Sequence, residues 1–293
     1  SARLVSVCPR PLSEDPTLPA RLYESLHTAL AFEHAQDFDL IHNNLGCYPV
    51  CWSRLIPVPL ITTLHGSAAE DDSRLIYSRY RESYYVSITD AERRLAPELN
   101  YVATVYNGID VGAFDFSPVP GDYLLVLGRM SPDKGIHAAI AVAQRCGMRL
   151  VLAGIVPPEN EEYFETQVRP HLKKGFIDFV GPADHARKNR LLRGAYALLH
   201  LITYHEAFGL TMVESMACGT PVIAVPMGSV PELVIHGETG FWADDVEEVC
   251  RLLPRVGSLD RARCRRWVEE RFGVDQMVDR YVEVYERVLA QKG

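Results

Sequence analysis

Two acidic residues, Glu206 and Glu214, stand on either side of the predicted start of a helix. Glu206 follows the apolar run at 197–202, and Gly209 begins an amphipathic pattern that extends to residue 217. The first turn of a helix carries unpaired backbone N–H groups, and the helix dipole attracts anions to that end. Glu214 lies about one and a half turns inside the helix. The spacing predicts two carboxylates that bind hydroxyl groups on either side of a phosphate.

Two cationic residues, Arg129 and Lys134, follow the apolar run at 123–127 at a spacing of five. Gly128 allows the backbone to approach a ligand closely, and a helix is predicted to begin near Lys134. Cationic side chains beside a helix N-terminus form a local site for a diphosphate. The sequence leaves open that these acids and cations are ordinary solvated charges, although apolar neighbours argue against this for Glu214.

A histidine, His65, directly follows the apolar run at 60–64, and Gly66 after it permits a sharp turn. Since the unperturbed pKa of histidine is about 6.5, His65 could donate a hydrogen bond or act as a base. A purely structural histidine is the alternative, and for His42, which ends the run at 39–42, we favour that alternative. Four nearby tyrosines are predicted to pack rather than to bind sugar: Tyr77, Tyr80, Tyr84 and Tyr85.

Short apolar runs alternate with amphipathic stretches along the whole chain. Runs of this kind are typical of strands buried on both faces, and their alternation with helices predicts parallel, doubly wound α/β sheets. The strands predicted in the first half are 4–7, 39–42, 60–64, 84–88 and 101–105, and those in the second half are 123–127, 149–153, 176–180, 197–202 and 221–225. The predicted helices are 135–145, 159–173, 184–194, 209–217, 246–254, 260–272 and 274–290. Ligands bind at the carboxyl ends of such strands, where the candidate residues lie.

The length of 293 residues favours two domains over a single core. The dipeptide Asn107-Gly108 is a strong turn signal, and Pro118 and Pro120 after it interrupt regular structure. We therefore predict a first domain at 1–113, a second at 114–273 and a final helix within 274–293.

The composition excludes several classes of protein. Hydrophobic residues make up 47% and charged residues 23%, which does not fit a disordered, collagenous or coiled-coil chain. The net charge is −8, from 30 basic and 38 acidic residues, and residues 1–115 contain no lysine. A protein that coats nucleic acid or an anionic membrane through bulk charge would carry the opposite sign. We expect no nucleic-acid partner, and any anion site must be local.

The seven cysteines lie mostly in apolar stretches, and Cys47 and Cys51 have no second pair at metal-ligand spacing. This pattern predicts reduced thiols in a cytoplasmic protein, without a metal site. No apolar stretch approaches the ~20 residues that span a bilayer, and peripheral membrane contact stays open. The fingerprint G-x-G-x-x-G and the phosphate loop G-x-x-x-x-G-K-[ST] are both absent, which disfavours a dehydrogenase or a nucleoside-triphosphate hydrolase.

Taken together, these segments resemble the retaining glycosyltransferase family 4, whose members have the GT-B fold. The most specific match runs from Glu206 to Glu214 and fits the family's E-x7-E pattern with its Phe-Gly-Leu core. Further matches follow in the family's order: Thr-Leu-His-Gly at 63–66, Asn-Gly-Ile-Asp at 107–110, Gly-Arg to Lys-Gly at 128–135, Gly-Thr-Pro-Val-Ile at 219–223, Val-Pro-Glu-Leu-Val at 230–234 and Gly-Glu-Thr-Gly-Phe at 237–241. The resemblance implies two Rossmann-like, doubly wound domains that face a cleft, with the acceptor side in the first domain and the donor in the second. The last helix, 274–290, would cross back to the first domain.

The resemblance also implies roles for individual residues. Arg129 and Lys134 would bind the donor diphosphate, and Glu206 would hold hydroxyls of the transferred sugar. Glu214 would bind the nucleotide ribose, and His65 would lie near the reacting carbon on the acceptor side. The remaining donor-binding positions would be Gly128, Gly181, Ala183, Phe208, Gly209 and Leu210. The catalytic residues would be His65, Arg129, Lys134 and Glu206.

The implied reaction moves a sugar from a UDP- or GDP-sugar to an acceptor hydroxyl, with retention and without a metal or another cofactor. One departure is that the strand, glycine-rich loop and long helix with which family members begin are not found in the sequence. We therefore expect an incomplete first domain, shorter by about 50 to 60 residues. Two alternatives stay open: a nucleotide-sugar-binding module without its own turnover, and a nucleotide-sugar epimerase, against which the E-x7-E pattern argues. The sequence identifies neither the acceptor nor the oligomeric state.

Overall fold

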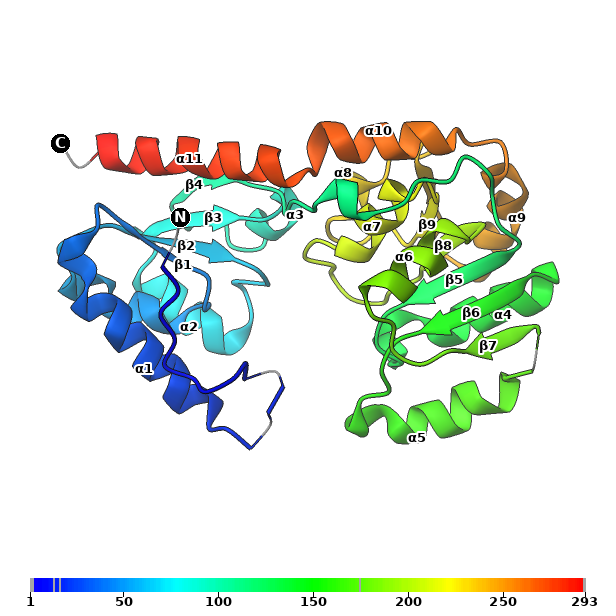
Figure 1. The fold of residues 1–293 in the computed structure, drawn as a ribbon, viewed down its shortest axis with the longest axis horizontal. Helices are drawn as coiled ribbons and strands as arrows, with labels where there is room; N and C mark the ends of the chain where they lie inside the picture. The colour runs from blue at the N-terminus through cyan, green and yellow to red at the C-terminus, as the bar shows by residue number, and fades with distance from the viewer. Residues whose placement is uncertain (1–2, 13, 16, 174, 292–293) are drawn as a thin grey trace. The chain divides into compact units, whose positions relative to one another are not determined.

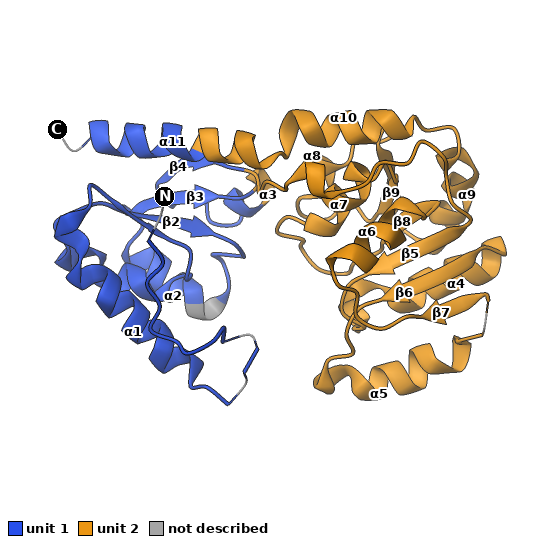
Figure 2. Ribbon diagram, viewed as in Figure 1, with its two compact units in different colours: residues 1–88, 92–105, 281–293 blue, residues 89–91, 106–280 orange. Residues whose placement is uncertain are grey.

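The computed structural model describes residues 3–12, 14–15, 17–173 and 175–291, apart from the side chains of residues 71 and 72. The chain divides into two compact units (Figure 2). Unit 1 consists of residues 1–88, 92–105 and 281–293, and unit 2 consists of residues 89–91 and 106–280. Each unit is built on its own parallel sheet, as the alternation of apolar runs and helical stretches predicts.

The described residues of unit 2 form six parallel strands in the order β10-β9-β8-β5-β6-β7, of which β5 to β9 are labelled in Figure 1. They are β5 (Tyr123–Leu127), β6 (Arg149–Ala153), β7 (Ile177–Phe179), β8 (Ala197–His200), β9 (Val222–Ala224) and β10 (Gly240–Trp242). The first five match predicted runs, whereas the three-residue β10 lies outside them. The order reverses between β5 and β8, and ligands bind where parallel strands reverse their order.

Both faces of this sheet are buried by helices. Alternate residues of β5 point to opposite faces, and Leu124, Leu125 and Val126 are all at most 4% exposed. One group of helices consists of α4 (Ile136–Cys146) and α9 (Val246–Val256), and another of α6 (His185–Arg193), α7 (Leu210–Ala217) and α10 (Arg261–Arg271). Burial on both faces explains why the strands are continuously apolar rather than alternating.

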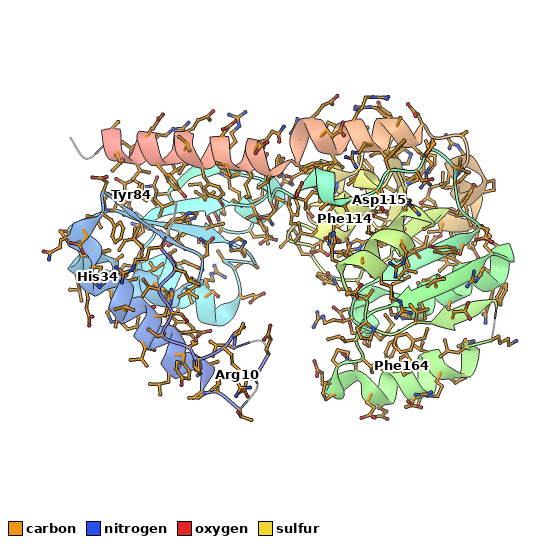
Figure 3. All side chains as sticks on the ribbon, in the orientation of Figure 1. Arg10, His34, Tyr84, Phe114, Asp115 and Phe164 are labelled. Carbon is orange, nitrogen blue, oxygen red and sulfur yellow. The ribbon has the colours of Figure 1, made fainter. Side chains whose placement is uncertain are left out.

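The stretch predicted as a helix at 159–173 is helical but irregular. It begins as α5 (Glu161–Tyr163), continues as a π-helix (Phe164–Val168) and ends in a 3-10 turn (Arg169–His171). Pro170 within the last turn lacks an N–H group and cannot continue regular α-helical hydrogen bonding. The apolar face is nevertheless kept, because the ring of Phe164 packs 4.8 Å from that of Phe179 in β7 (Figure 3).

Unit 1 contains four parallel strands in the order β1-β2-β3-β4. They are β1 (Ile41–Asn43), β2 (Leu60–Leu64), β3 (Tyr84–Ser87) and β4 (Tyr101–Thr104). The helices α1 (Ala20–Glu33) and α2 (Asp71–Arg79) belong to this unit, and α3 (Asp90–Arg93) follows β3. Tyr77 and Tyr85 are buried with their rings edge to face at 5.5 Å, which confirms that these tyrosines pack in the core.

The strand predicted at residues 4–7 is wrong. Residues 3–6 have no regular structure and residues 7–10 form bends, while Leu4 is 91% exposed. A strand needs a hydrogen-bonded neighbour to compensate for its lost entropy, and an apolar run alone does not supply one. Pro9 and Pro11, just beyond the run, also lack the N–H groups that a strand would use.

The last helix, α11 (Val274–Ala290), contributes residues 274–280 to unit 2 and the rest to unit 1 (Figure 2). In unit 1, the Tyr281 hydroxyl lies 2.9 Å from Thr63 Oγ1 of β2, and Arg287 donates to the Val102 carbonyl of β4 at 2.7 Å. The second half of α11 is therefore hydrogen-bonded to the inner strand β2 and to the edge strand β4 of this sheet. None of the helices in the described part of the chain is long and apolar enough to cross a bilayer.

Candidate functional site

The loops that follow β5 and β8 in unit 2 are held against each other by a glycine. Gly135 has a φ of 66°, and a Cβ on it would lie 1.8 Å from the Leu201 carbonyl oxygen. Only glycine tolerates both the left-handed backbone and this approach. The Thr203 N–H also donates to the Asp133 carbonyl at 2.9 Å. These contacts bring Lys134 next to the loop that carries Glu206.

Glu206 is the centre of a polar cluster at the carboxyl end of β8. Its Oε2 accepts a hydrogen bond from the Tyr204 hydroxyl at 2.6 Å, and it lies 3.1 Å from His200 Nε2 and 3.7 Å from Lys134 Nζ. Lys134 Nζ also donates to the Tyr204 hydroxyl. Lys134 and Glu206, which the sequence predicts separately as site residues, are therefore brought together. His200 and Tyr204 are additional members. His200 is the last residue of β8 and Tyr204 lies in the loop after it, and these places at the carboxyl end of a buried strand are the signal that could have identified them.

The cluster keeps the Glu206 carboxyl ionised. Burial by itself raises the pKa of Glu206, but hydrogen bonds from His200 and Tyr204, and the charge of Lys134, lower the pKa to about 2. The same cluster raises the pKa of the Tyr204 hydroxyl, first through burial and then through its bond to Glu206. At neutral pH the site therefore holds a carboxylate beside a neutral phenol.

The backbone from Glu206 to Phe208 is fixed by two other segments of unit 2. A Cβ on Gly228 would lie 2.3 Å from the Glu206 carbonyl oxygen, and the Ser229 N–H donates to that oxygen at 2.9 Å. The Ser229 hydroxyl donates to the Phe208 carbonyl at 2.7 Å, and the Thr89 hydroxyl donates to the Ala207 carbonyl at 3.0 Å. These contacts pre-organise the loop that leads into α7.

The helix α7 begins directly after Gly209, whose φ is 87°. Phe208 is buried, whereas Leu210 in the first turn is 43% exposed. The N-terminal N–H groups of this eight-residue helix therefore begin beside the Glu206 loop, as the sequence predicts.

Glu214 lies on α7 and is only 8% exposed, so the interpretation as a solvated surface charge is wrong. Its Oε1 accepts a hydrogen bond at 2.5 Å from Lys188 Nζ of α6. Lys188 Nζ also lies 5.7 Å from the ring centroid of Phe114, which in turn packs edge to face on His185 (Figure 3). Lys188 was not predicted, because the sequence does not reveal which face of α6 meets α7.

The loops after β5, β6 and β7 converge on two glycines. A Cβ on Gly154 would lie 1.8 Å from the Gly128 carbonyl oxygen, and the Gly154 N–H donates to the Gly181 carbonyl at 2.9 Å. Gly128, Gly181 and Ala183 therefore belong to adjoining loops at the carboxyl edge of the sheet. Arg129 beside them has a side chain that is 54% exposed and lies 3.7 Å from Asp133.

His65 lies in unit 1, at the carboxyl end of β2. Its Nε2 is 2.8 Å from Asn44 Oδ1, and burial lowers the pKa of its imidazole. His42 is a structural histidine, since Nδ1 is 2.8 Å from the Tyr285 hydroxyl and Nε2 is 2.7 Å from Thr63 Oγ1. Burial, and to a lesser degree His65, lower the pKa of His42 to about 4.

A comparison with protein families identifies the larger unit. Residues 116–266, just over half of the chain, match the family described as "Glycosyl transferases group 1". The chain belongs to this glycosyltransferase family. The resemblance expected from the E-x7-E pattern is thus confirmed, whereas the roles of individual residues stay predictions.

Curated relatives support the same assignment. Glycogen synthase of Mycobacterium tuberculosis is 29% identical over 234 residues, which covers 71% of this chain and 55% of the relative. D-inositol 3-phosphate glycosyltransferase of Mycobacterium bovis is 30% identical over 189 residues, which covers 59% of this chain and 39% of the relative. The chain therefore spans about half or less of the length of these glycosyltransferases.

Solved structures confirm the GT-B fold of two parallel α/β sheets. The Anabaena protein HepE in complex with UDP and glucose superimposes with a TM-score of 0.75 at 20% identity, covering 92% of this chain and 83% of HepE. Sucrose-phosphate synthase from Thermosynechococcus elongatus superimposes with a TM-score of 0.76 at 22% identity, covering 93% and 80% of the two chains. At sequence identities of 20% and 22%, the similarity to these structures shows the fold of this glycosyltransferase and nothing more.

Among the described residues of this glycosyltransferase, no group of three or more His, Cys, Asp or Glu side chains is arranged to hold a metal ion. The positive charge at the candidate donor site comes instead from Arg129, Lys134 and Lys188. That the reaction needs no metal or other cofactor stays a prediction.

Proposed function

We propose that this protein transfers a sugar from a nucleoside-diphosphate sugar to an acceptor hydroxyl, with retention and without a metal. The observation that carries the proposal is the Glu206 carboxylate. Its Oε2 contacts Tyr204, His200 and Lys134, while no described residue donates a hydrogen bond to Oε1. An ionised, buried carboxylate with one oxygen left over is suited to accept hydrogen bonds from sugar hydroxyls.

The diphosphate binds at the start of α7. Lys134 supplies a positive charge 3.7 Å from Glu206 and Arg129 supplies a second, and α7 begins at the same carboxyl edge of the sheet as the loops that carry them. When the bond between the sugar's anomeric carbon and the diphosphate oxygen breaks, negative charge develops on the diphosphate. Fixed cations and helix N–H groups aimed at that oxygen stabilise the transition state.

Retention follows if the acceptor attacks from the face that the diphosphate leaves. The acceptor oxygen forms a bond to the anomeric carbon, and its proton passes to the departing diphosphate, so the products are a glycoside and a protonated nucleoside diphosphate. Glu214, held by Lys188, binds the ribose, and the loop at Gly181 and Ala183 lines the base. The complexes of HepE with UDP and UDP-glucose make UDP-sugars the first candidates, with GDP-sugars next.

A thermal-shift panel of UDP-, GDP-, ADP- and TDP-sugars tests the proposal on the whole chain. A sugar nucleotide at about 100 times its dissociation constant adds roughly 2.7 kcal/mol to the free energy of unfolding, which corresponds to about 5–10 °C. We expect at least one sugar nucleotide to give such a shift. If none of the four does, the proposed donor site is wrong.

A second candidate function is donor binding without turnover. It is favoured by the placement of Lys134, Glu206 and Glu214 together in unit 2, because a donor site made by one unit can bind a nucleotide without the other unit. A stabilising sugar nucleotide that is neither consumed nor transferred over hours, in the presence of sugar and polyol acceptors, would support this candidate. Release of free nucleotide with a changed sugar, and without a glycoside product, would instead support an epimerase.

A further inference from the structure

The ends of β1 and β2 in unit 1 are joined by three pairs of polar side chains, of which Asn43 and Thr62 are direct register partners. Asn43 Nδ2 donates to Thr62 Oγ1 at 3.1 Å, and the next pair along, His42 Nε2 and Thr63 Oγ1, is 2.7 Å apart. The third pair lies beyond both strands and consists of Asn44 Oδ1 and His65 Nε2 at 2.8 Å. The first two pairs join strand residues and support the sheet, whereas the third lines a pocket.

The turn that presents Asn44 is built by its neighbour. Asn43 Nδ2 also donates to the Gly46 carbonyl at 2.9 Å, and Asn43 Oδ1 accepts from the Leu45 N–H at 2.9 Å. Gly46 has a φ of 79°, which closes the turn. Since Asn43 uses its amide to hold the turn, Asn44 is left to point its own amide at His65.

The pocket next to this pair has a volume of about 250 Å³. Its polar lining includes Asn44, Thr63, His65, Ser67, Glu70 and Ser73. The volume is just below the range of about 300–1,000 Å³ that is typical for drug-sized ligands, so it suits one sugar- or polyol-sized group. The lining offers amide, hydroxyl and imidazole groups, which exchange hydrogen bonds with hydroxyls.

The charge of this lining is unfavourable for a phosphate. Glu70 contributes a carboxylate, and as N-cap of α2 it offsets the positive end of that helix. Burial lowers the pKa of His65, so at neutral pH the imidazole is uncharged. A phosphate in the pocket would meet a like charge in Glu70, whereas a neutral hydroxyl would not.

Asn44 also determines which nitrogen of His65 carries the proton. Oδ1 of an amide is an acceptor, so its partner Nε2 must donate, and the uncharged imidazole then has a lone pair on Nδ1. No described residue makes a hydrogen bond to Nδ1. This nitrogen can accept the hydrogen of a bound hydroxyl.

We propose that this pocket binds a neutral polyhydroxyl acceptor, a sugar or cyclitol without phosphate, and that Asn44 is the positioning residue that holds His65 ready to accept its hydroxyl. This inference rests on the proposed function, because the ligand of the pocket is an acceptor only if the protein transfers a sugar. It adds the class of acceptor and a residue, Asn44, to which the E-x7-E resemblance assigns no role.

The tautomer of His65 tests the positioning role without any substrate. In the full chain labelled with ¹⁵N-histidine, we expect long-range ¹H–¹⁵N spectra at pH 8 to show His65 with its proton on Nε2. Asn44→Ala should give a mixture of tautomers, while Asn44→Asp, which keeps the acceptor oxygen, should restore the Nε2 form. Asn100→Ala is the control, because that amide donates to the Glu82 carbonyl at the surface of the same unit. A proton on Nδ1 in the wild type, or no effect of Asn44→Ala, overturns the role of Asn44.

Binding of matched acceptors tests the class of ligand. The probes are myo-inositol, D-glucose and maltose, each against a phosphorylated counterpart, with the His65 ring signals as the readout. We expect the neutral probes to move these signals, Asn44→Ala to weaken the response about tenfold, and the phosphorylated probes to be at least tenfold weaker. Glu70→Arg should reverse that preference. A stronger response to the phosphorylated probes, or no response to any neutral probe, overturns the proposed class.

UDP added to the same samples separates this inference from the donor proposal. A normal UDP response together with silent His65 signals contradicts only the acceptor inference. Loss of every nucleotide response while neutral polyols still move the His65 signals contradicts only the donor proposal.

Discussion

At the scale of single residues, the Glu206 carboxylate of the proposed donor site has three neighbours that all contact the same oxygen. Tyr204, His200 and Lys134 all contact Oε2, and together they fix the orientation of the carboxylate. Removal of one partner should therefore change what the carboxylate binds more than whether the unit folds.

Lys134→Ala should weaken nucleoside-diphosphate binding by about 10- to 100-fold. A charge-assisted hydrogen bond contributes about 1.5–3 kcal/mol, and Lys134 is the cation closest to Glu206. Titration calorimetry with UDP or GDP measures the effect. Lys173→Ala is the matched control, since it removes an exposed lysine from the same unit. Equal losses in the two variants would show that general charge, and not position, attracts the nucleotide.

Tyr204→Phe should weaken the binding of a UDP-sugar about five- to tenfold while leaving that of UDP nearly unchanged. The variant removes the 2.6 Å bond that helps to orient Glu206 and to lower its pKa. Paired titrations with UDP and UDP-glucose give the two affinities. Tyr163→Phe, which loses only a surface contact to His137, should leave both affinities unchanged. A parallel loss for UDP would contradict the assignment of Glu206 to the sugar.

The sequence identifies candidate site residues that can be recognised from their type and their position after a strand. It does not identify residues whose role depends on a contact with a side chain far away in the sequence. Glu206, Lys134 and His65 each follow a buried strand, so they could be named from position alone. Lys188 could not, because it lies within a helix and its partner Glu214 is 26 residues away. Asn44 also follows a strand, but its contact with His65, 21 residues away, is not visible in the sequence. The burial of Glu214 likewise depends on the approach of α6 to α7.

At the scale of elements, His42 links the four-stranded sheet to the second half of α11. Its pKa is about 4 in the folded chain and about 6.5 when unfolded, so the unfolded state binds protons first as the pH falls. The contribution of uncharged His42 to the free energy of unfolding is fully present above about pH 6.5 and is lost as the pH falls towards 4. At pH 5 the loss from this partly buried group should be about 1–2 kcal/mol.

Urea denaturation at pH 7 and pH 5 measures this loss, with hydrogen exchange of β1 as a local probe. His42→Gln should reduce the difference between the two pH values, because the new side chain does not titrate. His27→Gln, an exposed histidine of the same unit, should leave the difference as it is. An unchanged pH dependence in His42→Gln would show that another group is responsible.

Most elements were predictable because their patterns are local. The runs at 60–64, 123–127 and 149–153 match their strands residue for residue. The run at 4–7 failed because an apolar pattern does not say whether a partner strand is present. The π-helical turn at Phe164–Val168 was also missed, since amphipathic spacing is similar in both kinds of helix.

At the scale of the whole molecule, the two units share one helix. A stop after Arg280 removes Tyr281, Tyr285 and Arg287, and with them their bonds to β1, β2 and β4. We expect unit 1 to lose hydrogen-exchange protection in these strands, while unit 2 still binds its nucleotide. The double variant Tyr281→Phe/Tyr285→Phe keeps the rings and should cost only about 1–3 kcal/mol. Loss of nucleotide binding on truncation would show that unit 2 needs the removed segment.

The discontinuity of unit 1 sets an order for folding during synthesis. At about 5–20 residues per second, a ribosome takes roughly 10 to 35 s to make residues 106–280. Throughout that interval His42 and Thr63 have left the ribosome but Tyr281 and Tyr285 do not yet exist, whereas the six strands of unit 2 are becoming complete. Most of unit 1 is therefore translated before unit 2 but is completed after it, and its nascent sheet must wait for the closing helix.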